Sequence, residues 1–160
     1  MSELLHAATL AAALGCGAVA GVFFAFSAFV MRALVGLPPA QGVAAMQSIN
    51  RSAISPLFMA ALFGTALACL GLAAWAALSR GQPSTARLVM GGALYLVGAI
   101  LVTIARNVPL NEALAGLDPQ AADAAGHWAR YAATWTAWNH VRSLAALGAA
   151  ALLTVSLTVA

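Results

Sequence analysis

"PLFMAALFGTALACLGLAAWAAL", residues 56–78, is an apolar stretch without a charged side chain. It has the length of about 20 residues that an α-helix needs to cross the hydrocarbon layer of a bilayer. Ser55 stands directly before Pro56, and a serine cap followed by a proline in the first turn is a typical helix start. We therefore predict a transmembrane helix that begins at Pro56.

Similar apolar runs lie on both sides of this stretch. The chain is 63% hydrophobic and 7% charged, whereas soluble domains are about 45–50% apolar and about 25% charged. Lipid must therefore cover part of its surface. No stretch shows the alternation of apolar and polar residues that is typical of a membrane-spanning β-strand. We therefore predict an all-α membrane protein, an antiparallel four-helix bundle that forms one domain over residues 1–160. The expected spans are residues 4–31, 56–78, 87–105 and 138–159.

The connections between the spans are unequal. Residues 79–85, SRGQPST, form a short polar turn that makes the second and third spans antiparallel neighbours. Residues 32–54 are longer, and Val43, Met46 and Ile49 recur there at helical spacing. This pattern predicts a short interfacial helix that lies at the membrane surface or folds over the end of the bundle.

The last helix is expected to be much longer than its span. Asp118 is predicted to cap it and Pro119 to open it, with a continuous helical pattern up to Val159. Such a helix would be about 60 Å long, twice the hydrocarbon thickness. It must either project beyond the membrane or bend.

The membrane topology follows from the flanking charges. The first apolar run continues to Val30, beyond the 7–15 residues of a signal peptide, so we expect an uncleaved span. Arg80 and Arg87 flank the short connection, which favours a cytoplasmic position for it and for both termini.

Small residues line part of the first span. Gly17 and Gly21 are four residues apart, a spacing that lets membrane helices approach closely. We expect this face to pack inside the bundle, with a homo-oligomer contact as the alternative. Cys16 and Cys69 lie in apolar runs and are expected to be buried thiols that form neither a disulfide nor a metal pair.

Polar and aromatic residues gather at the start of the last span, in "WTAWNHVR", residues 135–142. At 100° per residue, an aromatic stripe leads to amide and guanidinium groups, a surface that suits a flat apolar ring system with a few oxygens. The alternatives are an interfacial aromatic belt and an arginine that reaches lipid headgroups. One helical face holds Trp128, Trp135, Asn139 and Arg142; the adjacent face holds His127, Tyr131 and Trp138; His140 lies to the side.

A second polar group ends the third span, in "RNVPLN", residues 106–111. Asn107 and Asn111 are four residues apart and share one face if the helix continues, although Pro109 is expected to end or kink it. Polar groups at this depth require protein or a water-filled cavity around them. The predicted ring of polar residues is completed by Arg106 and, from the first long connection, Asn50 and Arg51.

Several functions are disfavoured by what the sequence contains. The arginines are scattered singly along the chain, which gives no support for nucleic-acid binding. No carboxylate lies inside a span, which disfavours a carboxylate proton relay or a di-iron site. The histidines are too scattered for a metal motif, so no metal or cofactor is predicted, although a non-covalent haem on His127 or His140 is left open. The carboxylates are Glu3, Glu112, Asp118 and Asp123, and the third histidine is His6.

The sequence resembles the anthrone oxygenase-like family of small membrane proteins. The likeness rests on residues 21–51, GVFFAFSAFVMRALVGLPPAQGVAAMQSINR, on NVPLN at 107–111 and on WxxWNHVR at 135–142. It covers nearly the whole chain and implies a protein of the bacterial cytoplasmic membrane. The implied reaction is cofactor-independent oxygenation of an activated aromatic or polyketide-like CH₂ group by molecular oxygen.

The resemblance also implies roles for individual residues. A base would remove the acidic proton, and amide or cationic donors would hold the resulting enolate-like oxygen. His140 would be the base, with His127 as the alternative base. The donors would be Arg142, Asn139, Asn107 and Asn111, and the wall of the substrate pocket would include Trp135, Trp138, Trp128 and Tyr131.

Two other classes of function fit the same pattern. A non-catalytic membrane protein that binds a quinone, a haem or another planar ligand would need the pocket but no base, and a visible absorption band would favour it. A structural membrane subunit would instead co-purify with a fixed second protein.

Overall fold

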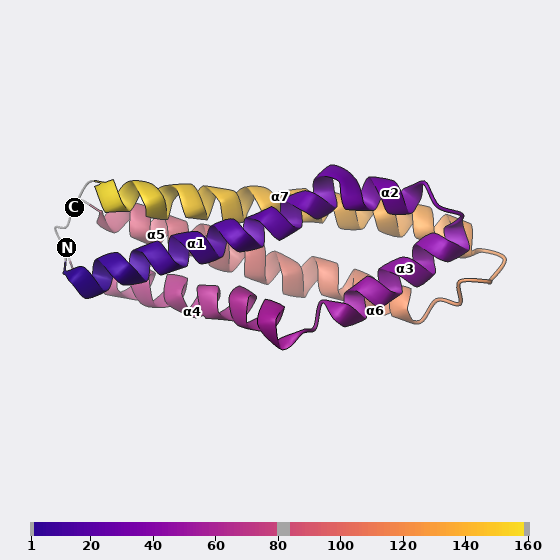
Figure 1. The fold of residues 1–160 in the computed structure, drawn as a ribbon, viewed down its shortest axis with the longest axis horizontal. Coiled ribbons are helices and arrows are strands. Elements are labelled where there is room, and N and C mark those ends of the chain that lie inside the picture. The colour runs from indigo at the N-terminus through magenta and orange to yellow at the C-terminus, as the bar shows by residue number, and fades with distance from the viewer. Residues whose placement is uncertain (1, 80–83, 159–160) are drawn as a thin grey trace.

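The computed structural model describes residues 2–79 and 84–158, and these residues form helices and connecting turns without a strand. Four long helical segments run side by side and antiparallel along one axis (Figure 1). The first comprises α1 (Glu3–Ala25), the π-helical segment η1 (Phe26–Val30) and α2 (Met31–Val35); the second is α4 (Pro56–Leu78). The third comprises α5 (Thr85–Ala93), the π-helical segments η2 (Leu94–Leu101) and η3 (Thr103–Asn107), and α6 (Val108–Ala115); the fourth is α7 (Ala124–Thr158).

These four segments are long and apolar enough to cross a membrane. Their outer faces are apolar as well, and Leu57 and Leu78 at the two ends of α4 are 83% and 85% exposed. In water such surfaces would be costly, whereas in a bilayer they contact lipid. The predicted four-span membrane bundle is confirmed.

The start of α4 follows its sequence signal closely. The Ser55 side chain accepts a hydrogen bond from the backbone N–H of Phe58 at 3.3 Å, and Pro56 occupies the first turn. The cap satisfies one N–H that the helix cannot, and the proline lacks an N–H that would otherwise be unpaired there. The prediction of residues 56–78 is correct at both ends.

The third segment departs from the prediction, because it does not end at Pro109. It continues to Ala115, and Pro109 lies in the first turn of α6. The segment η3 comes directly before it, and the Val108 N–H bonds the Thr103 carbonyl five residues back. This wider turn places the proline where a missing N–H costs little.

The last helix begins later than predicted. Residues 118–123 form turns, and α7 starts at Ala124. The Asp118 side chain accepts from the Gln120 N–H at 2.9 Å, a local bond of the kind that competes with helix capping. The prediction of an extended last helix is confirmed, since α7 is continuous for 35 residues and, at 1.5 Å per residue, about 52 Å long. It therefore projects beyond the hydrocarbon layer. The predicted end at Val159 and most of the 79–85 turn lie outside the described residues.

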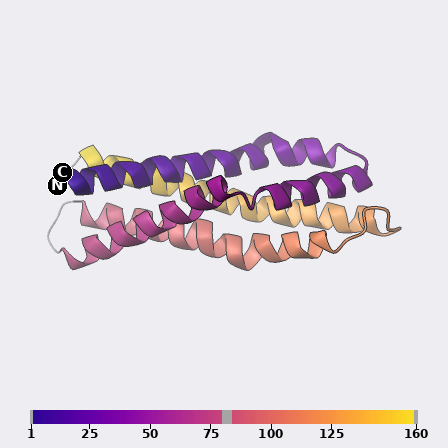
Figure 2. The same ribbon diagram turned by 60° about the horizontal axis from the view of Figure 1, so that its bottom comes forward.

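The predicted short helix is α3 (Pro39–Ser52). Val43 and Met46 are fully buried on the face that the sequence indicated, and α3 packs against α2, α6 and α7. It runs along the bundle beyond α4, in the half opposite the two described chain ends, where the long connections also lie (Figures 1 and 2).

The interior consists of two apolar clusters that succeed each other along the bundle. The membrane core, between α1, α4, α5 and α7, includes Phe23, Tyr95, Ala146 and Leu153; the end core, between α2, α3, α6 and α7, includes Met31, Met46, Leu114, Trp128, Tyr131 and Trp135. Between the two along α7 lie Asn139 and Arg142, both buried. Polar side chains therefore separate the two cores.

The α1 face that carries Gly17 and Gly21 points out of the bundle, not into it. A Cβ atom added to Gly17 or Gly21 would meet no atom within 4 Å, and both residues are exposed. The residue that packs tightly is Gly15, against Thr65 of α4. The expectation that Gly17 and Gly21 pack inside the bundle is therefore wrong.

The two cysteines are free and buried, as expected, yet they are neighbours. Cys16 of α1 and Cys69 of α4 bring their sulfur atoms to 3.6 Å in the membrane core. Their sequence positions gave no sign of this contact.

Candidate functional site

The polar layer between the two cores is centred on Arg142. Its Nη2 donates to Asn139 Oδ1 at 2.6 Å, and its Nη1 donates to Thr103 Oγ1 at 3.1 Å. The guanidinium carbon lies 4.2 Å from the ring centre of Phe23 and 5.2 Å from that of Trp135. Arg142 is thus enclosed by neutral acceptors and aromatic faces.

No carboxylate balances this charge. The ion pair between two described residues joins His127 and Asp123, at the start of α7 and away from Arg142. Arg142 is 5% exposed, and an arginine at the centre of a spanning helix costs about 2.5–3.5 kcal/mol even on insertion scales. Burying an arginine without a counter-ion costs folding free energy, and ionisable residues inside a membrane protein normally belong to a functional site.

Asn139 connects Arg142 to the first helical segment. Its Nδ2 group donates to the Phe23 carbonyl at 2.6 Å and to Ser27 Oγ at 2.7 Å. Ser27 belongs to η1, and π-helical turns recur at functional sites. A chain of hydrogen bonds therefore runs from Arg142 through Asn139 to Ser27.

Asn107 and Asn111 reach the same helix from the other side. Asn107 Nδ2 donates to the Trp135 carbonyl at 3.3 Å, while Asn111 Oδ1 accepts from Tyr131 Oη at 2.9 Å and from Trp135 Nε1 at 2.8 Å. The prediction that the two asparagines share a face is confirmed. Asn50 joins them through its Nδ2 group, 3.5 Å from Tyr131 Oη.

Other members of the predicted ring lie outside this layer. Arg106 is exposed, with its guanidinium carbon 4.8 Å from the ring centre of Trp138. Arg51 is exposed on α3. The structure therefore brings together the asparagines, Arg142 and the buried aromatics, but not Arg51, Arg106 or Trp138.

His140 also lies outside the layer, on the outer face of α7. It lines a groove of about 400 Å³ with Phe24, Ser27, Ala28, Ser143 and Leu144. Phe24 and Leu144 are 65% and 70% exposed on spanning segments, so the groove opens toward lipid. Ser27 belongs both to this groove and to the hydrogen-bond chain, and it therefore connects the groove to Arg142.

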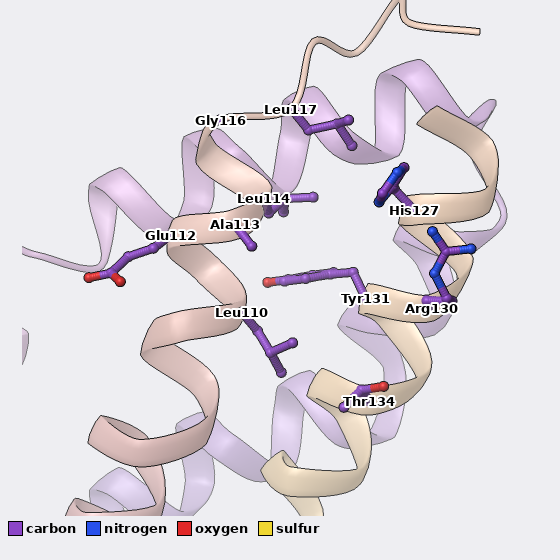
Figure 3. Close-up of a pocket in the computed structure, with 10 residues that line it drawn as sticks. All are labelled: Leu110, Glu112, Ala113, Leu114, Gly116, Leu117, His127, Arg130, Tyr131 and Thr134. Atoms are coloured by element: carbon purple, nitrogen blue, oxygen red, sulfur yellow. The ribbon is translucent and has the colours of Figure 1, made fainter. Parts of the chain in front are cut away.

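His127 occupies a different place. Its Nε2 lies 3.1 Å from Asp123 Oδ2, and it lines a cavity of about 520 Å³ between α6 and α7 (Figure 3). His127 and His140 therefore line two separate cavities.

Two buried polar atoms of the layer have no partner among the described residues, Nε of Arg142 and Oδ1 of Asn107. One is a donor and the other an acceptor, and buried groups of this kind usually bind a water molecule or a ligand atom. In the part of the chain that the structure describes, no three side chains of His, Cys, Asp or Glu come together as metal ligands.

Sequence reasoning missed Ser27 and Thr103. Each is a hydroxyl residue with apolar neighbours inside a span, and a polar residue in such a position was the one available signal. Hydroxyls in spans commonly bond their own helix, so the sequence alone did not single them out.

A family model described as anthrone oxygenase matches residues 55–152, more than half of the chain. The chain belongs to the anthrone oxygenase family. The match begins at the cap of α4 and includes Thr103, Asn107, Asn139, His140 and Arg142. No curated protein and no solved structure matches the chain. Family membership and the four apolar helices together describe an oxygenase-like membrane protein of the anthrone oxygenase family.

Proposed function

We propose that this member of the anthrone oxygenase family oxidises an activated aromatic CH₂ group to a ketone, with dioxygen, in the groove lined by His140 and Ser27. The observation that carries the proposal is the environment of Arg142. This buried cation has no carboxylate beside it, and its hydrogen bonds lead through Asn139 to Ser27 in that groove. A cation kept in this way is suited to stabilising negative charge that develops only during a reaction.

The groove suits a flat apolar substrate. Its volume of about 400 Å³ falls within the range of small-molecule sites, about 300–1,000 Å³. Phe24 and Leu144 supply apolar walls, and His140 supplies the one titratable group among its lining residues. Because the groove opens on spanning helices, both an aromatic substrate and dioxygen can reach it from the lipid.

In this proposal His140 acts as the base. The imidazole removes a proton from the CH₂ group, and the electron pair left on carbon is delocalised onto the conjugated carbonyl oxygen. Dioxygen then adds at the carbon, and the imidazolium returns its proton to the peroxide oxygen. Loss of water from the hydroperoxide breaks the O–O and remaining C–H bonds, so CH₂ and O₂ become C=O and H₂O without a further reductant.

Ser27 is placed to stabilise the oxyanion. Its oxygen accepts from Asn139, and no acceptor for its own hydrogen appears among residues 2–79 and 84–158. The hydroxyl can therefore donate to a substrate oxygen. Arg142 strengthens this donor through Asn139, since hydrogen bonds in a chain polarise one another at low dielectric.

The asparagines of the third segment have a different role in this proposal. The Oδ1 atom of Asn111 is occupied by Tyr131 and Trp135, and Asn107 holds the backbone of α7. They act as positioning residues that fix Trp135 against Arg142, rather than as oxyanion donors.

Anthrone-dependent oxygen uptake by purified protein tests the proposal, with spontaneous oxidation subtracted. His140→Ala is expected to lower the rate by about 10²–10⁴, as for loss of a general base. Ser27→Ala is expected to lower it by about 10²–10³, as for loss of an oxyanion donor. Matched controls are His6→Ala and Ser48→Ala, two exposed residues elsewhere, which should retain the wild-type rate.

Full activity in His140→Ala would remove this residue as the base. Wild-type uptake no faster than the spontaneous reaction would refute the oxygenase itself. A visible absorption band in the purified protein would in that case favour the binding of a quinone, a haem or another planar ligand.

A further inference from the structure

The cavity between α6 and α7 is a second hollow, separate from the His140 groove. Its volume is about 520 Å³, and it lies in the part of the bundle beyond α4. The wall on the α6 side is largely apolar. It consists mainly of Leu110, Ala113 and Leu114 of α6 and of Leu117, which follows that helix (Figure 3).

The wall formed by α7 carries polar groups, His127, Arg130, Tyr131 and Thr134. Arg130 has no ion-pair partner in the described part of the chain. His127 stands beside Asp123, which offsets its charge when it is protonated. Glu112 also borders the cavity, but Figure 3 shows its carboxylate turned away from Tyr131 and the α7 wall.

Tyr131 gives this cavity a fixed aromatic floor. Its ring reaches from α7 toward α6 (Figure 3), and its hydroxyl is held by Asn111 at 2.9 Å. The ring also stacks on Trp128, with the ring centres 5.7 Å apart. An aromatic or aliphatic body can therefore lie on this ring beside the leucines, with a polar end near Arg130.

We propose that this cavity binds an amphiphile with an anionic carboxylate or phosphate group, whose apolar body lies on the Tyr131 ring beside the leucines that line the cavity and whose charge pairs with Arg130. The apolar wall alone would accept a neutral molecule equally well, so the unpaired guanidinium selects the acid. The site does not depend on the reaction at His140, since it uses none of the groove residues.

The anionic group could come from a membrane lipid or from a dissolved acid, and the composition of the bilayer separates the two sources. The full-length protein is placed in nanodiscs of phosphatidylcholine, and the probes are 9-anthracenecarboxylate and the neutral 9-anthracenemethanol. Binding is measured by fluorescence anisotropy, with empty nanodiscs subtracted. In discs that contain phosphatidylglycerol, loss of carboxylate binding identifies a lipid headgroup as the occupant, and unchanged binding identifies a dissolved acid.

The carboxylate is expected to bind at least about tenfold more tightly than the alcohol, and Arg130→Gln should remove that difference. Arg32→Gln, an exposed arginine on α2, is the matched control and should bind like the wild type. Ala113→Phe fills the cavity from an exposed position and should abolish the tighter binding of the carboxylate. Raising the salt concentration from 0.1 to 0.5 M should weaken the binding of the carboxylate probe but not that of the alcohol.

Equal binding of the two probes, or unchanged carboxylate binding in Arg130→Gln, would overturn the proposal. Ser27→Ala and His140→Ala should leave the tighter binding of the carboxylate over the alcohol intact, because that preference depends on Arg130. Loss of the preference in these variants would place its origin in the groove, which refutes the second site but not the oxygenase.

Discussion

Replacing Asn139 by leucine is the most direct way to test whether Arg142 is an uncompensated buried charge. The substitution removes two hydrogen bonds to Phe23 and Ser27 and one from the guanidinium. Neutral bonds contribute about 1 kcal/mol each, and the charged one about 1.5–3 kcal/mol. Because Arg142 stays buried with fewer acceptors, we expect Asn139→Leu to lose about 3–5 kcal/mol of stability.

The informative variant is the double replacement, Asn139→Leu with Arg142→Met. It removes the charge together with its acceptor, and replacing both partners of a buried polar pair by apolar groups is often nearly neutral. We expect a loss below about 2 kcal/mol, so the second substitution restores stability while the oxygenase activity remains lost.

Thermal unfolding in detergent measures these changes, since about 1 kcal/mol corresponds to about 2–4 °C for a chain of this size. Asn50→Leu is the matched control. Its one hydrogen bond to Tyr131 is long, 3.5 Å, so its expected shift is small. A double variant that is as unstable as the sum of the two single variants would refute the idea that Arg142 is held at a cost.

Two further predictions concern packing. Gly98→Ala should destabilise the bundle by about 1–3 kcal/mol, because a Cβ there would overlap the Cβ of Ala145, whereas Gly71→Ala meets no atom within 4 Å. Equal unfolding temperatures for the two variants would contradict the close packing of the helices at Gly98. Oxidation by copper phenanthroline should join Cys16 to Cys69, since their sulfur atoms are 3.6 Å apart. Intact mass should then fall by two hydrogens, and a Cys69→Ala protein that shows the same loss would exclude this pairing.

The sequence was most informative where the signal is local. Composition and run length fixed the four spans, and Ser55 with Pro56 marked the start of α4 because cap and proline act on the nearest backbone groups. Polar residues on an apolar helix also revealed one buried face of α7, since a membrane offers them no other partner. For the same reason the paired spacing of Asn107 and Asn111 was correctly interpreted.

The errors arose where a local pattern has two outcomes. Of the two outcomes expected at Pro109, an end or a kink, the end is wrong, because the π-helical turn before the proline lets the helix continue. Asp118 was expected to cap α7, but its side chain closes a turn with Gln120 instead. In both cases the competing structures differ by little energy, and packing of the surrounding helices decides between them.

By itself, the sequence determined that this protein is a four-helix membrane bundle with polar groups on its third and fourth spans. Only the tertiary structure decided that Gly17 and Gly21 face outward, that Ser27 meets Asn139, and that Arg142 has no carboxylate beside it. The physical reason is that a helix that is apolar on all sides has no amphipathic pattern from which its buried face could be predicted. The partner of each side chain then depends on how the helices are rotated and packed against one another, which the sequence of a single span does not determine.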